Sequence, residues 1–107
     1  MEEIRTKNFT AKDMFNAATA KPLKSMVGQT ISIVAIWICE RPDLDGVVQT
    51  VANIKTDDGT IYGTISETVI RSLFALPEML LTEESIAVNV EERDGTKGRN
   101  YIVITLA

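Results

Sequence analysis

The chain of 107 residues contains no histidine and only one cysteine, Cys39. A single cysteine cannot form an internal disulfide, and the common ligand sets for zinc and other transition metals need histidine or several cysteines. Histidine is also the commonest general base, and no GxSxG or P-loop pattern occurs. We therefore expect no metal, no cofactor and no enzymatic activity, and a reducing compartment.

Long apolar runs are also missing, since no stretch approaches the roughly 18 apolar residues of a membrane-spanning helix. The first residues, MEEIRTKNF, lack the apolar core of a secretory signal. These features predict a cytoplasmic protein without membrane contact. The length and the 45% of apolar residues suit one compact domain.

Positive charge and aromatic residues are scarce. The 11 Lys and Arg face 15 Asp and Glu, which gives a net charge of -4, and aromatic residues make up 6% of the chain. This balance argues mildly against nucleic acid, because neutralising phosphates needs Lys and Arg. Binding depends on where the basic residues cluster, however, and several of them fall in predicted loops.

The remainder of the pattern predicts a mainly β protein. Alternating or β-branched segments suggest five strands, at 29–40, 47–55, 60–65, 85–93 and 101–106. A helix with apolar residues at intervals of three and four begins at Ser66 and is closed by Pro77. This order is that of an OB-type Greek-key barrel with one helix between strands three and four. A four-plus-one antiparallel sheet packed on the helix is the alternative.

Residues 1–28 are expected to form an N-terminal arm or a short helix ahead of the barrel at 29–107, within one domain overall. Thr10 can cap a helix with Asp13 three residues later. Pro22 and Gly28 interrupt the segment that contains Lys24, and this pattern is equally compatible with an extended arm.

A first candidate site for single-stranded DNA lies around Tyr62, because such binding needs aromatic faces for bases and cations for phosphates. Asp58-Gly59 predicts a tight turn, after which alternation places Tyr62 on the polar face of the third strand. The second strand offers Asn53 and Lys55 on the same face. The alternative is a tyrosine that merely covers the sheet with its hydroxyl in water.

A second candidate group lies at the turn between the last two strands. Lys97 and Arg99 precede Tyr101, which points away from the inward residues of its strand. In OB-folds the loops between strands one and two and between strands four and five flank the binding cleft, which places Arg41, Lys97 and Arg99 at its rims. An ordinary solvated hairpin is the alternative.

The sequence is compatible with two roles for Trp37. It shares a face with Ile31, Ile33 and Ala35, and it belongs to the core if that face stays inward. A curled barrel strand can instead expose its far end and turn Trp37 towards DNA. The three phenylalanines are expected to pack inside the protein: Phe9, Phe15 and Phe74.

Three segments carry a family resemblance: FNAATA at 15–20, DGTIYGTISETV at 58–69 and GTKGRNYIVITL at 95–106. They resemble the small single-stranded DNA-binding proteins of protein-primed Bacillus phages and of related phages of other Gram-positive bacteria. The resemblance implies an OB-type barrel that coats exposed strands during phage DNA replication in a bacterial host. The DNA-contacting tyrosine of the family's DG-x-x-Y segment matches Tyr62. The family's aromatic residue late in the first strand aligns near Cys39.

The sequence therefore predicts a protein that binds and protects single-stranded DNA with little sequence preference. The candidate binding residues are Tyr62, Lys55, Tyr101, Lys97, Arg99, Arg41, Asn53 and Trp37. The alternative is a small β-barrel that binds another protein through a face with Val47, Val51 and Tyr62. The edges of an incompletely closed barrel are also compatible with a homodimer.

Overall fold

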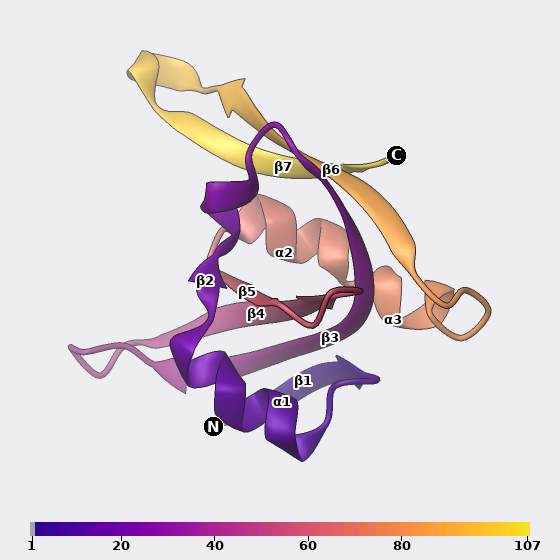
Figure 1. Cartoon of the computed structure of the whole chain (residues 1–107). Coiled ribbons are helices and arrows are strands. Elements are labelled where there is room, and N and C mark those ends of the chain that lie inside the picture. The colour runs from indigo at the N-terminus through magenta and orange to yellow at the C-terminus, as the bar shows by residue number, and fades with distance from the viewer. Residues whose placement is uncertain (1) are drawn as a thin grey trace.

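A computed structural model describes residues 2–107 of the chain, with side chains from residue 4 onward. Within these residues the protein is mainly β, and seven strands form one strongly curled sheet (Figure 1). The strands are β1 (Glu2–Lys7), β2 (Lys21–Pro22), β3 (Thr30–Pro42), β4 (Val48–Thr56), β5 (Ile61–Thr64), β6 (Ile86–Asp94) and β7 (Asn100–Leu106).

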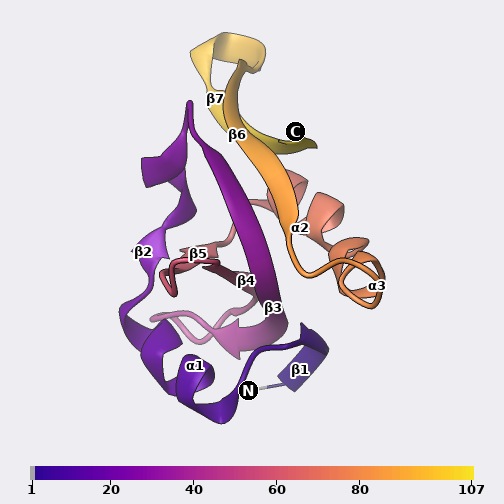
Figure 2. The same ribbon diagram turned by 45° about the vertical axis from the view of Figure 1, so that its right-hand side comes forward.

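The five strands expected from the sequence correspond to β3 to β7, whereas β1 and β2 were not expected. The sheet runs in the order β2-β5-β4-β3-β6-β7, and β1 pairs with β3. β4 pairs along one edge of β3, while β6 and β1 share the other edge one after the other. The long β3 therefore connects all parts of the sheet, as Figures 1 and 2 show.

The helix expected between the third and fourth barrel strands is present as two short helices, α2 (Glu67–Leu73) and α3 (Leu76–Met79). Pro77 does not end the first helix, since it lies in the first turn of α3. A proline is tolerated there because the first N–H groups of a helix have no intrahelical partner. No helix in residues 2–107 has the length and apolar character to cross a membrane.

The N-terminal segment contains a short helix, extended chain and two 3-10 turns. A short helix, α1 (Ala11–Asn16), begins at Thr10, whose hydroxyl accepts the Asp13 N–H at 3.1 Å while the Asp13 carboxylate accepts the Thr10 N–H at 3.0 Å. This capping box confirms the helix signal. The chain then continues through two 3-10 turns, η1 (Ala17–Thr19) and η2 (Leu23–Met26), beside β5.

At Val34 the side chains of β3 switch from one face of the sheet to the other. Ile33 pairs with Thr56, but the next paired residue, Ala35, is opposite Lys55, so one extra residue is inserted in β3. Side chains alternate between the two faces of a strand, and one inserted residue moves all later side chains to the opposite face. Trp37 therefore does not share the face of Ile33, which corrects the expectation from simple alternation.

Two hydrophobic clusters result, one on each face of β3. The main core inside the curled sheet contains Ile33, Ile36 and Ile38 together with the apolar face of α2. The second cluster lies on the outer face of the sheet under the N-terminal segment, and it comprises Phe9, Ala17, Ala35, Trp37, Cys39, Val51 and Ile61. The N-terminal segment thus completes a second core and is not a free arm.

The three phenylalanines occupy different environments. Phe9 is buried and packs on Trp37 with 5.8 Å between the ring centroids. Phe74 is partly buried against the main core. Phe15 is 83% exposed on α1, so the expectation that it packs inside is wrong.

The turn between β4 and β5 has three residues, 57 to 59, and not two. Ile54 is opposite Tyr62, and the Thr56 N–H donates to the Thr60 carbonyl at 2.9 Å. Gly59 has a φ of 88°, a conformation that favours glycine. The longer turn shifts the register by one residue, and Tyr62 consequently faces the main core beside Ile54. The predicted position of Tyr62 on the polar face is wrong for this reason.

The second cluster generates a stability prediction. Replacing Trp37 by alanine should lower the free energy of unfolding by about 3–5 kcal/mol, because a large buried side chain leaves a cavity. Replacing the exposed Phe15 by alanine should change it by less than about 0.5 kcal/mol. Urea denaturation followed by circular dichroism would measure both, and equal losses would contradict the assignment of Trp37 to a core.

Candidate nucleic-acid interface

A groove of about 590 Å³ lies on the side of the protein where the curled sheet stays open. Its floor is the outer face of β4 and β5, and its walls are the N-terminal segment at 17–24 and the β6–β7 hairpin. The β3–β4 and β6–β7 hairpins project towards this side, with β2 between them (Figure 1). The volume is in the usual range for ligand sites, about 300–1,000 Å³.

Three of the predicted binding residues meet in this groove: Arg41, Asn53 and Tyr101. Arg41 comes from the end of β3, Asn53 from the middle of β4 and Tyr101 from the start of β7. The Tyr101 side chain is 43% exposed and available for contact with a ligand. The fold thus brings together residues that lie far apart in the sequence.

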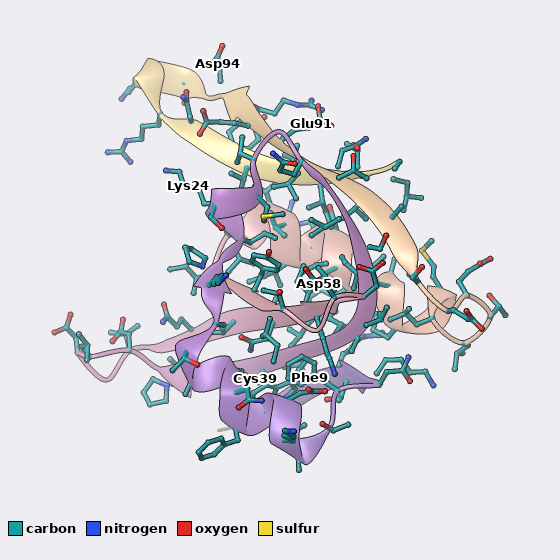
Figure 3. All side chains as sticks on the ribbon, in the orientation of Figure 1. Phe9, Lys24, Cys39, Asp58, Glu91 and Asp94 are labelled. Carbon is teal, nitrogen blue, oxygen red and sulfur yellow. The ribbon has the colours of Figure 1, made fainter. Side chains whose placement is uncertain are left out.

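Lys24 is a further groove residue that the sequence did not identify. It belongs to η2, and its side chain projects away from the ribbon below the β6–β7 hairpin (Figure 3). Among the residues with described side chains, neither Lys24 nor Arg41 forms an ion pair. Glu92 is the acidic residue of the groove lining, so two cations and one carboxylate line it.

Lys97 and Arg99 lie at the exposed tip of the β6–β7 hairpin, around a 3-10 turn, η3 (Thr96–Gly98). They do not line the groove. They were expected at the rim of a cleft, and their hairpin does form one wall of the groove. Lys97 and Arg99 thus belong to this hairpin without being part of the groove lining.

Lys55 lies outside the groove and is engaged elsewhere. Its ammonium group is 3.1 Å from the buried carboxylate of Asp13, and this ion pair joins α1 to β4. Burial raises the pKa of Asp13, but hydrogen bonds from Thr10 and Lys55 outweigh it and leave this pKa below its usual value. Lys55 thus holds the N-terminal segment in place, in contrast to its predicted role at a phosphate.

Tyr62 and Trp37 are both buried, at 7% exposure each, and neither lines the groove. Stacking on a base requires an exposed ring, so the structure contradicts the predicted stacking of a base on Tyr62.

The predicted protein-binding face with Val47, Val51 and Tyr62 is also wrong, because its residues do not share one exposed face. Val51 is buried in the second cluster and Tyr62 in the main core, while Val47 is exposed on the hairpin.

The groove combines an aromatic ring, two cations, one carboxylate and two carboxamides with apolar side chains. Such a set can bind a planar ring and an anionic group. Within the described part of the chain, no three His, Cys, Asp or Glu side chains gather closely enough to hold a metal ion. The arrangement thus suits binding of a ligand that has both bases and phosphates.

The Asp13–Lys55 pair predicts a pH dependence of stability. The pKa of Asp13 is lowered by folding, so its stabilising contribution is full above the unfolded pKa of about 4 and is lost as the pH falls through the folded pKa. Asp13→Asn should lower the free energy of unfolding by about 1–3 kcal/mol at pH 7. The difference from the wild type should shrink below pH 4 in urea titrations. A difference that is constant from pH 7 to pH 2 would contradict this role.

The chain was also compared with models of protein families, with curated proteins and with solved structures, and no match was found. The resemblance to phage single-stranded DNA-binding proteins therefore stays a prediction.

Proposed function

We propose that the protein binds single-stranded DNA in the groove and coats exposed strands, as in phage DNA replication, with little sequence preference. The observation that carries this proposal is the convergence of Tyr101 with Arg41 and Lys24 in one open groove. An exposed aromatic ring offers a stacking surface that tolerates every base, and the two cations can approach phosphates. A net charge of -4 for the whole chain does not prevent this local arrangement.

The order of the elements supports an OB-type barrel as the basis of this site. Strands β3 to β7, with α2 and α3 between β5 and β6, follow the order of such a barrel. OB-folds bind oligonucleotides on the face of the second and third strands and at the loops between strands one and two and between strands four and five. The corresponding parts here are β4, β5, the end of β3 at Arg41 and the β6–β7 hairpin, and each contributes residues to the groove.

In the proposed complex, a base stacks on Tyr101 while Arg41 and Lys24 neutralise phosphates. Lys97 and Arg99 at the hairpin tip can contact the strand where it leaves the groove. Each neutralised phosphate of a single strand contributes about -0.7 to the slope of log affinity against log salt. Two to four contacts thus imply a slope of about -1.4 to -2.8.

The stacking role of Tyr101 predicts that Tyr101→Ala weakens binding of oligo(dT) by about 1–3 kcal/mol, or roughly 5- to 150-fold. Fluorescence anisotropy of a labelled oligonucleotide would measure the affinity. Phe15→Ala removes an aromatic ring that is exposed outside the groove and should leave the affinity unchanged.

The role of Arg41 predicts that Arg41→Ala reduces the salt slope by about 0.7. Arg71→Ala, which removes an exposed cation of α2, should leave the slope as it is. A wild-type protein that does not bind oligo(dT) would refute the proposed function. Unchanged binding by both groove variants at two salt concentrations would show that the groove is not the site.

A second candidate function, a protein-interaction module, is favoured by a different surface. Leu44, Val47 and Val48 are all strongly exposed on the β3–β4 hairpin. Neighbouring exposed aliphatic side chains can mark a contact with a protein, including a second copy of the chain. Sedimentation velocity would test the second copy: dimers that Leu44→Ser dissociates, without any binding of oligo(dT), would favour this function.

A further inference from the structure

Asn53 is a nearly buried polar residue on the floor of the groove, with 3% of its surface exposed. It lies in the middle of β4, opposite Gly63 of β5. A Cβ atom on Gly63 would be 3.3 Å from Asn53 Oδ1 and 3.6 Å from the Cβ of Ala20. The absence of a side chain at Gly63 therefore keeps the space beside the carboxamide open.

The Asn53 carboxamide has no hydrogen-bond partner among the side chains and backbone groups of the described residues. The other two buried polar residues do have partners: Asp13 binds Thr10 and Lys55, and Thr56 donates to Asp58. Among the described side chains, the fully buried polar atoms without a partner are Thr6 Oγ1 and the indole nitrogen of Trp37, so the carboxamide of Asn53 keeps contact with the solvent of the groove. Because Asn53 lines the groove, a ligand in the groove can satisfy its carboxamide.

On the basis of the proposed function, we propose that Asn53 hydrogen-bonds the Watson–Crick edge of an unpaired base that enters the groove. A carboxamide has an acceptor oxygen beside an NH₂ donor. The Watson–Crick edge of each base also has a donor next to an acceptor: N6–H and N1 in adenine, N4–H and N3 in cytosine, N1–H and O6 in guanine, and N3–H and O4 in thymine.

Two properties of the protein follow from this pairing. The carboxamide can match any of the four bases in one of its two orientations, so the contact does not impose a sequence. In a duplex the same edge is already paired with the opposite strand, so the contact selects single strands. Asn53 is therefore a specificity-determining residue for single-stranded over double-stranded DNA.

The test compares oligo(dT) with a duplex of the same length for the wild type and for Asn53→Leu, which keeps the size of the side chain but removes the donor and the acceptor. We expect affinity for oligo(dT) to fall about 10-fold, as for loss of a bidentate base contact. Affinity for the duplex should not change. Asn16→Leu changes an exposed asparagine of α1 that does not line the groove and should leave both affinities unchanged.

Asn53→Asp separates base recognition from a structural effect. A carboxylate offers two acceptors, which suit the neighbouring N1–H and N2–H donors of guanine, while thymine offers one donor between two carbonyl groups. The variant should therefore lose more affinity for oligo(dT) than for an unstructured guanine-containing strand. A purely structural effect would weaken both equally, which would overturn the inference.

Gly63→Ala keeps the test decisive if the Asn53 variants do not fold, because its added Cβ would crowd the Asn53 oxygen from the opposite strand. We expect it to reduce the preference for oligo(dT) over the duplex, and thermal unfolding would confirm that it is folded.

Competition by the mononucleotide dTMP, which offers the same Watson–Crick edge, should be weak if a DNA strand is the ligand. Displacement of oligo(dT) by dTMP at equal concentration would overturn the assignment to a strand.

The binding of single-stranded DNA and the role of Asn53 can be refuted separately. A wild-type protein without affinity for oligo(dT) would refute the proposed function and this inference with it. A wild type that binds, together with Asn53→Leu and Gly63→Ala variants that bind and discriminate equally well, would refute the inference alone.

Discussion

The inserted residue at Val34 of β3 allows one strand to supply two hydrophobic cores. Ahead of it, Ile31 and Ile33 face the interior of the curled sheet, and after it Ile36 and Ile38 do so. The residues that alternate with Ile36 and Ile38 are Ala35, Trp37 and Cys39, and they consequently face outward. An outward row of apolar side chains must be covered, and the N-terminal segment covers it. The second cluster and the wall of the groove both depend on this one reversal.

The cover over the outer face is held by specific interactions. β1 pairs with β3, a capping box begins α1, and Asp13 of that helix pairs with Lys55 of β4. β2 then pairs with β5 through only two residues, Lys21 and Pro22. The segment therefore covers the outer face near Trp37, reaches Gly63 and Asn53 at Ala20, and forms one wall of the groove.

The composition of the groove follows from this geometry. Residues that would be solvent-exposed on an open sheet, such as Val51, are buried beneath the N-terminal segment, whereas Arg41 and Tyr101 remain accessible at the rims. Lys24 reaches the groove because η2 follows β2 directly. An acidic chain thus has a small surface on which two cations, one carboxylate, an aromatic ring and an unpaired carboxamide occur together.

The sequence by itself determined the five main strands, the helical region after Ser66 and the capping box at Thr10, because each depends on local patterns. Three of its candidate binding residues, Arg41, Asn53 and Tyr101, line the groove. Only the tertiary structure decided which way Trp37 and Tyr62 point, since one extra residue in a strand or a turn reverses every following side chain. Likewise, the tertiary structure decided that Lys55 pairs with Asp13 and that Lys24 lines the groove. Both depend on contacts between distant segments, which local sequence patterns do not contain.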